Sequence, residues 1–151
     1  MPFPIPRPGL VIGYSYLWLA EHRQGLVEGK KDRPCVIVLA TEATPDRTAL
    51  QSPRSPIALP PITHSPPQDD AAVEIPAATK QRLGFDAERS WVVISEVNRF
   101  VWVGPDLRPV SRENAGRFDY GMLPPALFAR IRSLLVENAR QRRIGLVIRQ
   151  E

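Results

Sequence analysis

Short apolar segments rich in β-branched and aromatic residues are the feature that most limits how this chain can fold. Pro, Gly and polar residues separate these segments, which favours strands over helices for most of them. We interpret as strands residues 9–19, 34–40, 57–63, 72–75 and 91–97, the last continued or bent by residues 100–103. The prolines within residues 57–63 limit that segment to an edge or an end position in a sheet. Five or six short strands predict a mainly β protein.

Two segments predict helices instead. Residues 77–83 form one or two helical turns between Pro76 and Gly84, which suit the start and the end of a helix. Residues 126–140 follow a proline pair and predict a longer terminal helix with one apolar face. The apolar residues at helical spacing in this segment are Leu127, Phe128, Ile131, Leu134 and Leu135. The tail at residues 142–148 fits either a last strand or an arm that contacts a partner.

The rest of the chain predicts loops around a single domain covering residues 1–151. Residues 20–32 and 41–56 form long polar loops in this interpretation, and residues 1–8 form a proline-rich, extended lead-in. The first two strands, on either side of the first loop, predict an antiparallel hairpin. A length of 151 residues is that of one ordinary domain. Short strands, long loops and one terminal helix predict a small, strongly bent barrel rather than a parallel α/β sheet.

Composition narrows the classes of function. A hydrophobic content of 43%, with no apolar run near the roughly 20 residues of a membrane helix, predicts a chain that does not span a membrane. The proline-rich start disfavours a signal or transit peptide, so a cytoplasmic location is the default expectation. The single cysteine, Cys35, cannot form an internal disulfide and is expected in the core. The formal charge of +4, carried mostly by arginine, permits RNA binding without demonstrating it.

Several common chemistries lack their motifs in this sequence. It contains no GxGxxG, GxxxxGK[ST] or GxSxG, so phosphate-cradling loops and hydrolase elbows find no support. The two histidines, His22 and His64, and the lone cysteine form no cluster with zinc spacing. We therefore expect neither a metal nor a cofactor.

Two rigid polar corners are the best candidates for a site. Arg33 precedes Pro34 at the start of an apolar strand, on backbone that the proline keeps extended. Thr63, His64 and Ser65 lie between two proline pairs further along the chain. These residue types suit metal-free cleavage of RNA, in which an arginine stabilises charge on the phosphoryl oxygens, a hydroxyl holds the phosphate and a histidine acts as base. Possible auxiliary residues are Glu21, His22, Arg23, Glu96 and Arg99.

Each corner also has a purely structural interpretation. Arg33 can form a surface ion pair with Asp32 or Glu28, and composition alone favours that interpretation. His64 can be a hydrogen-bonding loop residue, and Thr63 can cap the end of a strand. The individual residue types leave both interpretations open.

Several short motifs follow one another in a recognisable order. The first half contains the segment Gly9 to Trp18, a glycine-containing loop, Lys31-Asp32-Arg33-Pro34 before an apolar run, and Pro61-Ile62-Thr63-His64-Ser65. The second half contains Leu83-Gly84-Phe85-Asp86, the segment Trp91 to Phe100, and Tyr120-Gly121-Met122-Leu123-Pro124 before the terminal helix. This ordered series, which covers most of residues 9–140, is similar to that of the PemK/MazF family of type II toxins.

The resemblance implies a fold, an activity and partners. It implies a small SH3-like barrel of the PemK/MazF/CcdB type, a homodimer, metal-independent and sequence-specific endoribonuclease cleavage of single-stranded RNA or mRNA, and neutralisation by an antitoxin protein. In many members the arginine before proline and the threonine after the later strand are catalytic, which corresponds here to Arg33 and Thr63. We add His64 as a candidate catalytic residue, with His64 or His22 as the base. The candidate substrate-binding residues are Ser65, His22, Arg23, Lys31, Glu96 and Arg99.

One departure from the family bears directly on function. An Arg-x-Asp pair that is catalytic in the PemK branch is missing, because the corresponding residues are Val93-Ile94-Ser95-Glu96. Activity then depends on Arg33, with His64, Ser65 or Glu96 filling the gap. One alternative is a non-catalytic, CcdB-like toxin that binds gyrase, although the sequence lacks the Trp-Gly-Ile terminus of such proteins. Another alternative is a module that only binds an antitoxin.

Overall fold

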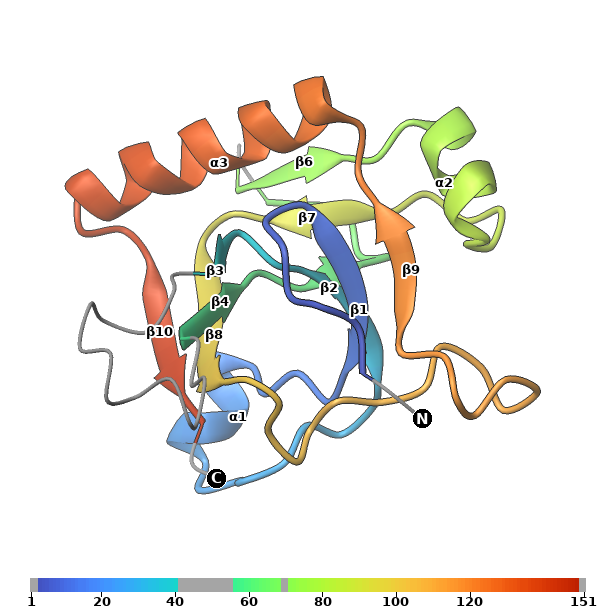
Figure 1. The fold of residues 1–151 in the computed structure, drawn as a ribbon. Helices are drawn as coiled ribbons and strands as arrows, with labels where there is room; N and C mark the ends of the chain where they lie inside the picture. The colour runs from blue at the N-terminus through green and yellow to red at the C-terminus, as the bar shows by residue number, and fades with distance from the viewer. Residues whose placement is uncertain (1–2, 41–55, 69–70, 150–151) are drawn as a thin grey trace, which may run out of the picture.

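The computed structural model describes residues 3–40, 56–68 and 71–149, which form ten strands and three helices (Figure 1). The expected mainly β fold with a C-terminal helix is confirmed. The long loop expected at residues 41–56 lies outside the described residues, apart from Pro56 at the start of a strand. Within the described ranges, no helix is long and apolar enough to cross a membrane.

The strands form three sheets. The first sheet contains, in order, β2 (Arg33–Val36), β1 (Leu10–Tyr14) and β9 (Asp119–Met122). The second contains β10 (Gly145–Ile148), β8 (Glu96–Val101), β4 (Pro56–Leu59) and β3 (Leu39–Ala40). The third contains β5 (Ile62–Thr63), β7 (Trp91–Val93) and β6 (Ala72–Glu74). The pair of β10 and β8 is parallel, and the other pairs of these sheets are antiparallel, including the expected hairpin of β1 and β2.

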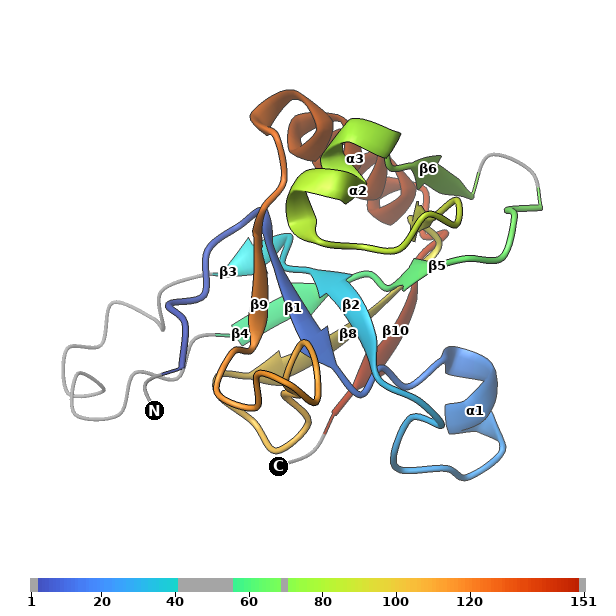
Figure 2. The same cartoon turned by 90° about the vertical axis from the view of Figure 1, so that its right-hand side faces the viewer.

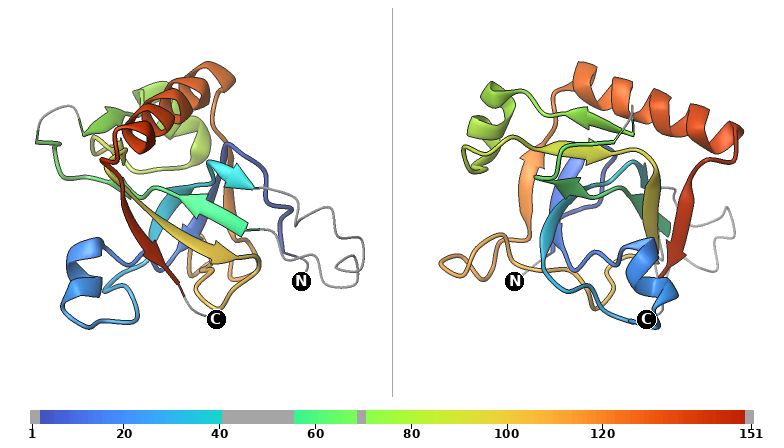
Figure 3. Two further views of the ribbon diagram at one scale, coloured as in Figure 1. Left: turned by 90° about the vertical axis from the view of Figure 1, so that its left-hand side faces the viewer. Right: turned by 180° about the vertical axis from the view of Figure 1, so that it is seen from behind.

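The three sheets surround a common interior, and the helices lie outside it (Figures 1 and 2). α3 (Pro125–Arg140) lies across β6 and β7, and α2 (Ala77–Leu83) lies at the neighbouring corner next to β9. α1 (Leu19–Arg23) lies at the opposite end of the molecule, beside β10 (Figure 3). Across the described residues, strand pairing is divided among the three sheets and does not continue around one closed barrel.

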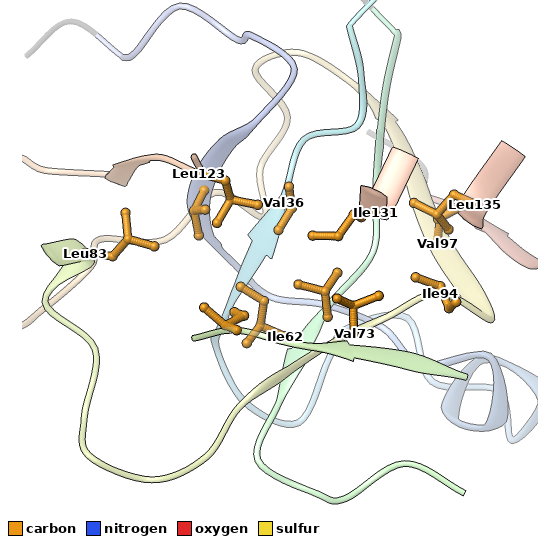
Figure 4. Packing of buried hydrophobic residues seen from close by; sticks show 12 residues of the cluster. Val36, Ile62, Val73, Leu83, Ile94, Val97, Leu123, Ile131 and Leu135 are labelled. Atoms are coloured by element: carbon orange, nitrogen blue, oxygen red, sulfur yellow. The ribbon is translucent and has the colours of Figure 1, made fainter. Parts of the chain in front are cut away.

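The alternation of side chains along the first sheet divides the core into two clusters. Val11 and Val36 pack into one cluster, whereas Ile12 and Cys35 pack into the other, because successive residues of a strand face opposite sides. Cys35 is fully buried, which confirms its expected place in the core. Figure 4 shows the first cluster, in which Ile131 of α3 lies close to Val36.

Both predicted helices are confirmed. α2 spans Ala77–Leu83, and Gly84 ends it in a left-handed conformation with a φ of 78°. α3 spans Pro125–Arg140, one residue longer at its start than expected, and its apolar face packs against the first cluster. Ile131 and Leu135 are buried in this face, and burying each side chain contributes about 1.5–3 kcal/mol.

The first strand and the loop after it differ from expectation. Pairing covers only Leu10–Tyr14 rather than residues 9–19, and α1 begins at Leu19 within the segment expected to be strand and loop. At the start of this helix the Glu21 carboxylate accepts a hydrogen bond of 3.1 Å from the backbone N–H of Trp18. Such a contact satisfies one of the free donors of a helix start, so a five-residue helix forms in a polar segment.

The number of strands exceeds the predicted five or six because several apolar segments divide. Residues 34–40 contain parts of β2 and β3, residues 57–63 contain parts of β4 and β5, and residues 91–103 contain β7 and β8. β9 occupies a polar, glycine-containing segment with no strand pattern of its own, and it forms by pairing with β1. The tail forms the strand β10 on β8 rather than a free arm.

Candidate functional site

A pocket of about 250 Å³ brings the two polar corners of the sequence together. Arg33 and Lys31 reach it from the start of β2, and His64 reaches it from the end of β5. These two strands lie side by side, and Cys35 of β2 forms a bridge with Pro61, the residue just before β5 (Figure 2). The loop after α2 and strand β9 complete the wall with Phe85, Asp86 and Tyr120.

The Arg33 guanidinium is partly buried and has no ionic partner among the described residues. Its Cζ lies 5.0 Å from the centre of the Trp18 ring, and its Nε is enclosed without a hydrogen-bond partner. Burial lowers the pKa of Arg33 from its ordinary value. Asp32 pairs instead with Arg108 at 3.5 Å, so the alternative of an ion pair with Arg33 does not apply. An enclosed, unpaired cation at a pocket wall is suited to binding an anion.

His64 is exposed at the pocket and lies between two carboxylates. Its Nε2 is 3.0 Å from Oδ2 of Asp86, and its Nδ1 is 3.4 Å from Oε2 of Glu88. Oδ1 of Asp86 is 3.3 Å from the Nζ of the buried Lys80. Partial burial opposes ionisation of Asp86, but the hydrogen bond from Lys80 and the neighbouring His64 together lower its pKa. The ring of His64 is therefore held in one orientation by contacts at both of its nitrogens.

The same three residues bear on whether the pocket binds a metal. Within the described part of the chain, ligand atoms of His64, Asp86 and Glu88 lie within 4.8 Å of one another. The two carboxylates, however, contact opposite nitrogens of the ring, which point away from each other. Three such ligand atoms are a candidate cation site that the sequence did not predict, because its histidines and cysteine show no zinc spacing.

Thr63 and Ser65 flank His64 but have other contacts. Oγ1 of Thr63 accepts a hydrogen bond of 3.1 Å from the backbone N–H of Ser65, which is the strand-end role that the sequence left open. Ile62 and His64 line the pocket and Thr63 lies between them, as expected where successive side chains of an extended chain alternate. Ser65 is exposed beyond this turn.

His22 and Arg23 lie on α1 and do not line this pocket. His22 lines a separate pocket of about 330 Å³ with Val27 and Ile148. Arg23 is exposed at the end of the helix. The structure therefore brings together Arg33 and His64 and leaves the other histidine in a different pocket.

Glu96 and Arg99, both on β8, also lie outside the pocket wall. Oε1 of Glu96 accepts hydrogen bonds of 3.0 Å from the Tyr16 hydroxyl and of 3.0 Å from the backbone N–H of Leu19. Arg99 is exposed. Glu96 thus links β8 to the start of α1.

Sequence reasoning missed the acidic partners of His64. Asp86 entered only as part of a short motif, and Glu88 did not enter at all. The strand register explains their position: Thr63 pairs with Trp91 in antiparallel strands, so the residues after Thr63 meet the residues before Trp91. This pairing is a tertiary property, and the only local signal is the concentration of charge before Trp91.

Comparison with known proteins adds no assignment. No protein-family model matches the chain, and no curated protein is significantly similar to it in sequence. The functional interpretation therefore depends on the residues of the pocket and on the order of motifs in the sequence.

Proposed function

We propose that this chain is a toxin of the PemK/MazF type, an endoribonuclease that cleaves single-stranded RNA without a metal ion. The observation that carries the proposal is the pocket shared by Arg33 and His64, an unpaired cation and an oriented imidazole from distant parts of the chain. These are the two groups that metal-free cleavage of a phosphodiester requires. The ordered motifs of the sequence support the same reaction.

His64 acts as the base in this mechanism. It removes the proton of the ribose 2′-hydroxyl through Nδ1, whose 3.4 Å contact with the exposed Glu88 is the longer of its two contacts. Asp86 keeps the ring oriented through Nε2. The 2′-oxygen then attacks phosphorus, the bond to the 5′-oxygen breaks, and the products are a cyclic 2′,3′-phosphate and a 5′-hydroxyl.

Arg33 acts on the phosphate. Its guanidinium stabilises the negative charge of the pentavalent intermediate and donates a proton to the leaving 5′-oxygen, which becomes the 5′-hydroxyl. Lys31, exposed on the same wall, adds a second positive charge that attracts the RNA backbone. Because such attraction is electrostatic, affinity for RNA falls as salt rises.

The wider assignment follows the same resemblance. The mainly β fold with its C-terminal helix is compatible with an SH3-like barrel. A homodimer, an antitoxin partner and a cytoplasmic location belong to the proposal as properties of PemK/MazF toxins.

Cleavage of RNA by purified protein tests the proposal. Single-stranded RNA is incubated with the wild type, Arg33→Ala and His64→Ala in the presence of a chelator, and the ends of the products are mapped. We expect cyclic phosphate ends from the wild type and a loss of about 100- to 10,000-fold in each variant. Arg132→Ala, at an exposed position of α3, is the matched control and retains activity.

Two results would contradict the proposal. One is equal cleavage by the wild type and both pocket variants, or no cleavage by any of them. The other is growth arrest on expression that survives Arg33→Ala, which would favour the non-catalytic, gyrase-binding alternative.

A further inference from the structure

The Arg33 guanidinium packs on an aromatic ring, and the Glu21 carboxylate acts on it electrostatically without forming an ion pair. Among the described residues its guanidinium has no ion-pair partner, and its enclosed Nε has no hydrogen-bond partner. The contact that remains is the Trp18 ring, whose centre lies 5.0 Å from Cζ of Arg33. A cation over an aromatic face is attracted by the charge distribution of the ring. The orientation of the Arg33 side chain therefore follows the orientation of Trp18.

Trp18 is in turn held from both sides along the chain. Its ring packs edge-on against the ring of Tyr16, with 5.2 Å between the centres and 74° between the planes. Its backbone N–H donates to Glu21 at the start of α1. Tyr16 lies two residues before Trp18 and Leu19 lies one residue after it, and both donate a hydrogen bond to Glu96.

Glu96 makes these two hydrogen bonds through a single oxygen atom. The Tyr16 hydroxyl and the Leu19 N–H both lie 3.0 Å from Oε1 of Glu96, on a strand distant in sequence. Burial raises the pKa of Tyr16, so its hydroxyl stays protonated and donates. Both contacts need an acceptor oxygen, and neither needs a negative charge. A glutamine side chain has such an oxygen.

We propose that Glu96 and Trp18 are positioning residues for Arg33: Glu96 fixes the segment on both sides of Trp18, and the Trp18 ring fixes the guanidinium at the pocket. The consequence for catalysis depends on the proposed function, whereas the positioning itself does not. This role differs from the substrate contact that the sequence suggested for Glu96, because here its charge is dispensable.

Nuclear magnetic resonance of the Arg33 side chain tests the positioning without any substrate. The Nε–H signal is assigned by its loss in Arg33→Lys, and its shift by the current of the Trp18 ring is measured in each variant. We expect Glu96→Gln to retain the shift and Glu96→Leu to lose it, and Trp18→Leu, which has no ring, gives the reference value without the shift. Glu113→Leu, at an exposed loop position, is the matched control and retains it.

Kinetics on single-stranded RNA tests the consequence. We expect Glu96→Gln to retain at least half of the wild-type kcat. Glu96→Leu and Trp18→Leu should lower kcat at least tenfold, with less change in KM, because substrate still enters the pocket while Arg33 is misplaced. Thermal unfolding identifies a variant that fails to fold. If Glu96→Leu does not fold, the kinetics of Trp18→Leu, at a partly exposed position, still test the positioning role.

Three results separate the two proposals. If Glu96→Gln loses as much activity as Glu96→Leu, the charge acts directly and the positioning role is wrong. If folded Glu96→Leu keeps the wild-type shift of Arg33, the positioning role is also wrong. If the wild type does not cleave RNA, the proposed function fails, and the resonance comparison still decides the positioning role.

Discussion

His64 and Asp86 contact each other through Nε2 and Oδ2, which are 3.0 Å apart. The other oxygen of the same carboxylate, Oδ1, lies 3.3 Å from the Nζ of Lys80, a residue that is only 5% exposed. One carboxylate thus orients an exposed imidazole at the pocket and compensates a buried ammonium. Because a buried charge without a partner is costly, Asp86 serves both the fold and the site.

Asp86→Asn should weaken both roles. The amide keeps the size of the side chain but loses the charge next to Lys80, so we expect the free energy of unfolding to fall by about 1–3 kcal/mol in urea titrations. A positioned base is worth about 100- to 10,000-fold, so loss of its orientation should lower RNA cleavage by roughly tenfold or more. Asp119→Asn on β9 is the control. Wild-type stability and cleavage in Asp86→Asn would contradict the role.

Thr63→Ala should affect the turn more than the reaction. Oγ1 of Thr63 accepts the N–H of Ser65, and losing one such bond costs about 0.5–1.5 kcal/mol of stability. Because Thr63 does not line the pocket, we expect RNA cleavage to fall by less than tenfold, measured beside His64→Ala. Thr63→Ser keeps the acceptor and should match the wild type. A loss in Thr63→Ala as large as that in His64→Ala would instead support the catalytic threonine that the resemblance implies.

The parts of the fold that sequence predicts well are those with local signals. α2 lies between Pro76 and Gly84, and α3 has a proline start and apolar residues at helical spacing, so both were predictable within a residue. α1 and β9 have no such pattern. At the start of α1, backbone N–H groups donate hydrogen bonds to Glu21 and to Glu96 of β8. Strand β9 forms by pairing with β1. The formation of α1 and β9 depends on contacts with residues that are distant in the sequence.

The site divides in the same way. Arg33 was predictable because an arginine before proline at the start of an apolar run is a local pattern. The partners of His64 were not, because they depend on the register between β5 and β7. The sequence makes Glu96 a candidate substrate-binding residue, whereas in the structure its carboxylate accepts two hydrogen bonds and does not line the pocket. Residue type thus located the candidates, and strand register determined their contacts.

A buried network around Arg149 leads to a stability prediction. Its guanidinium lies 3.0 Å from Asp106 and donates to the backbone oxygens of Ser15 and Val27 and to the Asn98 side chain. Replacing it leaves Asp106 buried without this partner. We expect Arg149→Met to lower the free energy of unfolding in urea by about 3–5 kcal/mol.

Two variants control for the change at Arg149. Arg140→Met alters an exposed arginine at the end of α3 and should change stability by no more than about 0.5 kcal/mol. Asp106→Asn combined with Arg149→Met should cost less than the sum of the two single changes, since it removes a buried charge whose remaining partner, Arg108, lies 4.0 Å away. If Arg149→Met unfolds at the same urea concentration as Arg140→Met, the network does not stabilise the fold.

The lowered pKa of Asp86 predicts an acid-sensitive contribution to stability. A carboxyl group that ionises more readily in the folded state stabilises it at pH values above its ordinary pKa of about 4. Below that value the unfolded chain binds the proton first, so the contribution is lost as pH falls through the folded pKa. Stability should therefore rise with pH in this window.

Unfolding in urea between about pH 2 and pH 6 measures this contribution. We expect the free energy of unfolding of the wild type to fall more steeply below about pH 4 than that of Asp86→Asn, which has no carboxyl at this position. The two proteins should differ most at the neutral end of the range and approach each other at the acid end, where Asp86 is protonated. Asp119→Asn should follow the wild type throughout. Parallel curves for wild type and Asp86→Asn would mean that Lys80 and His64 do not favour the ionised form of this group.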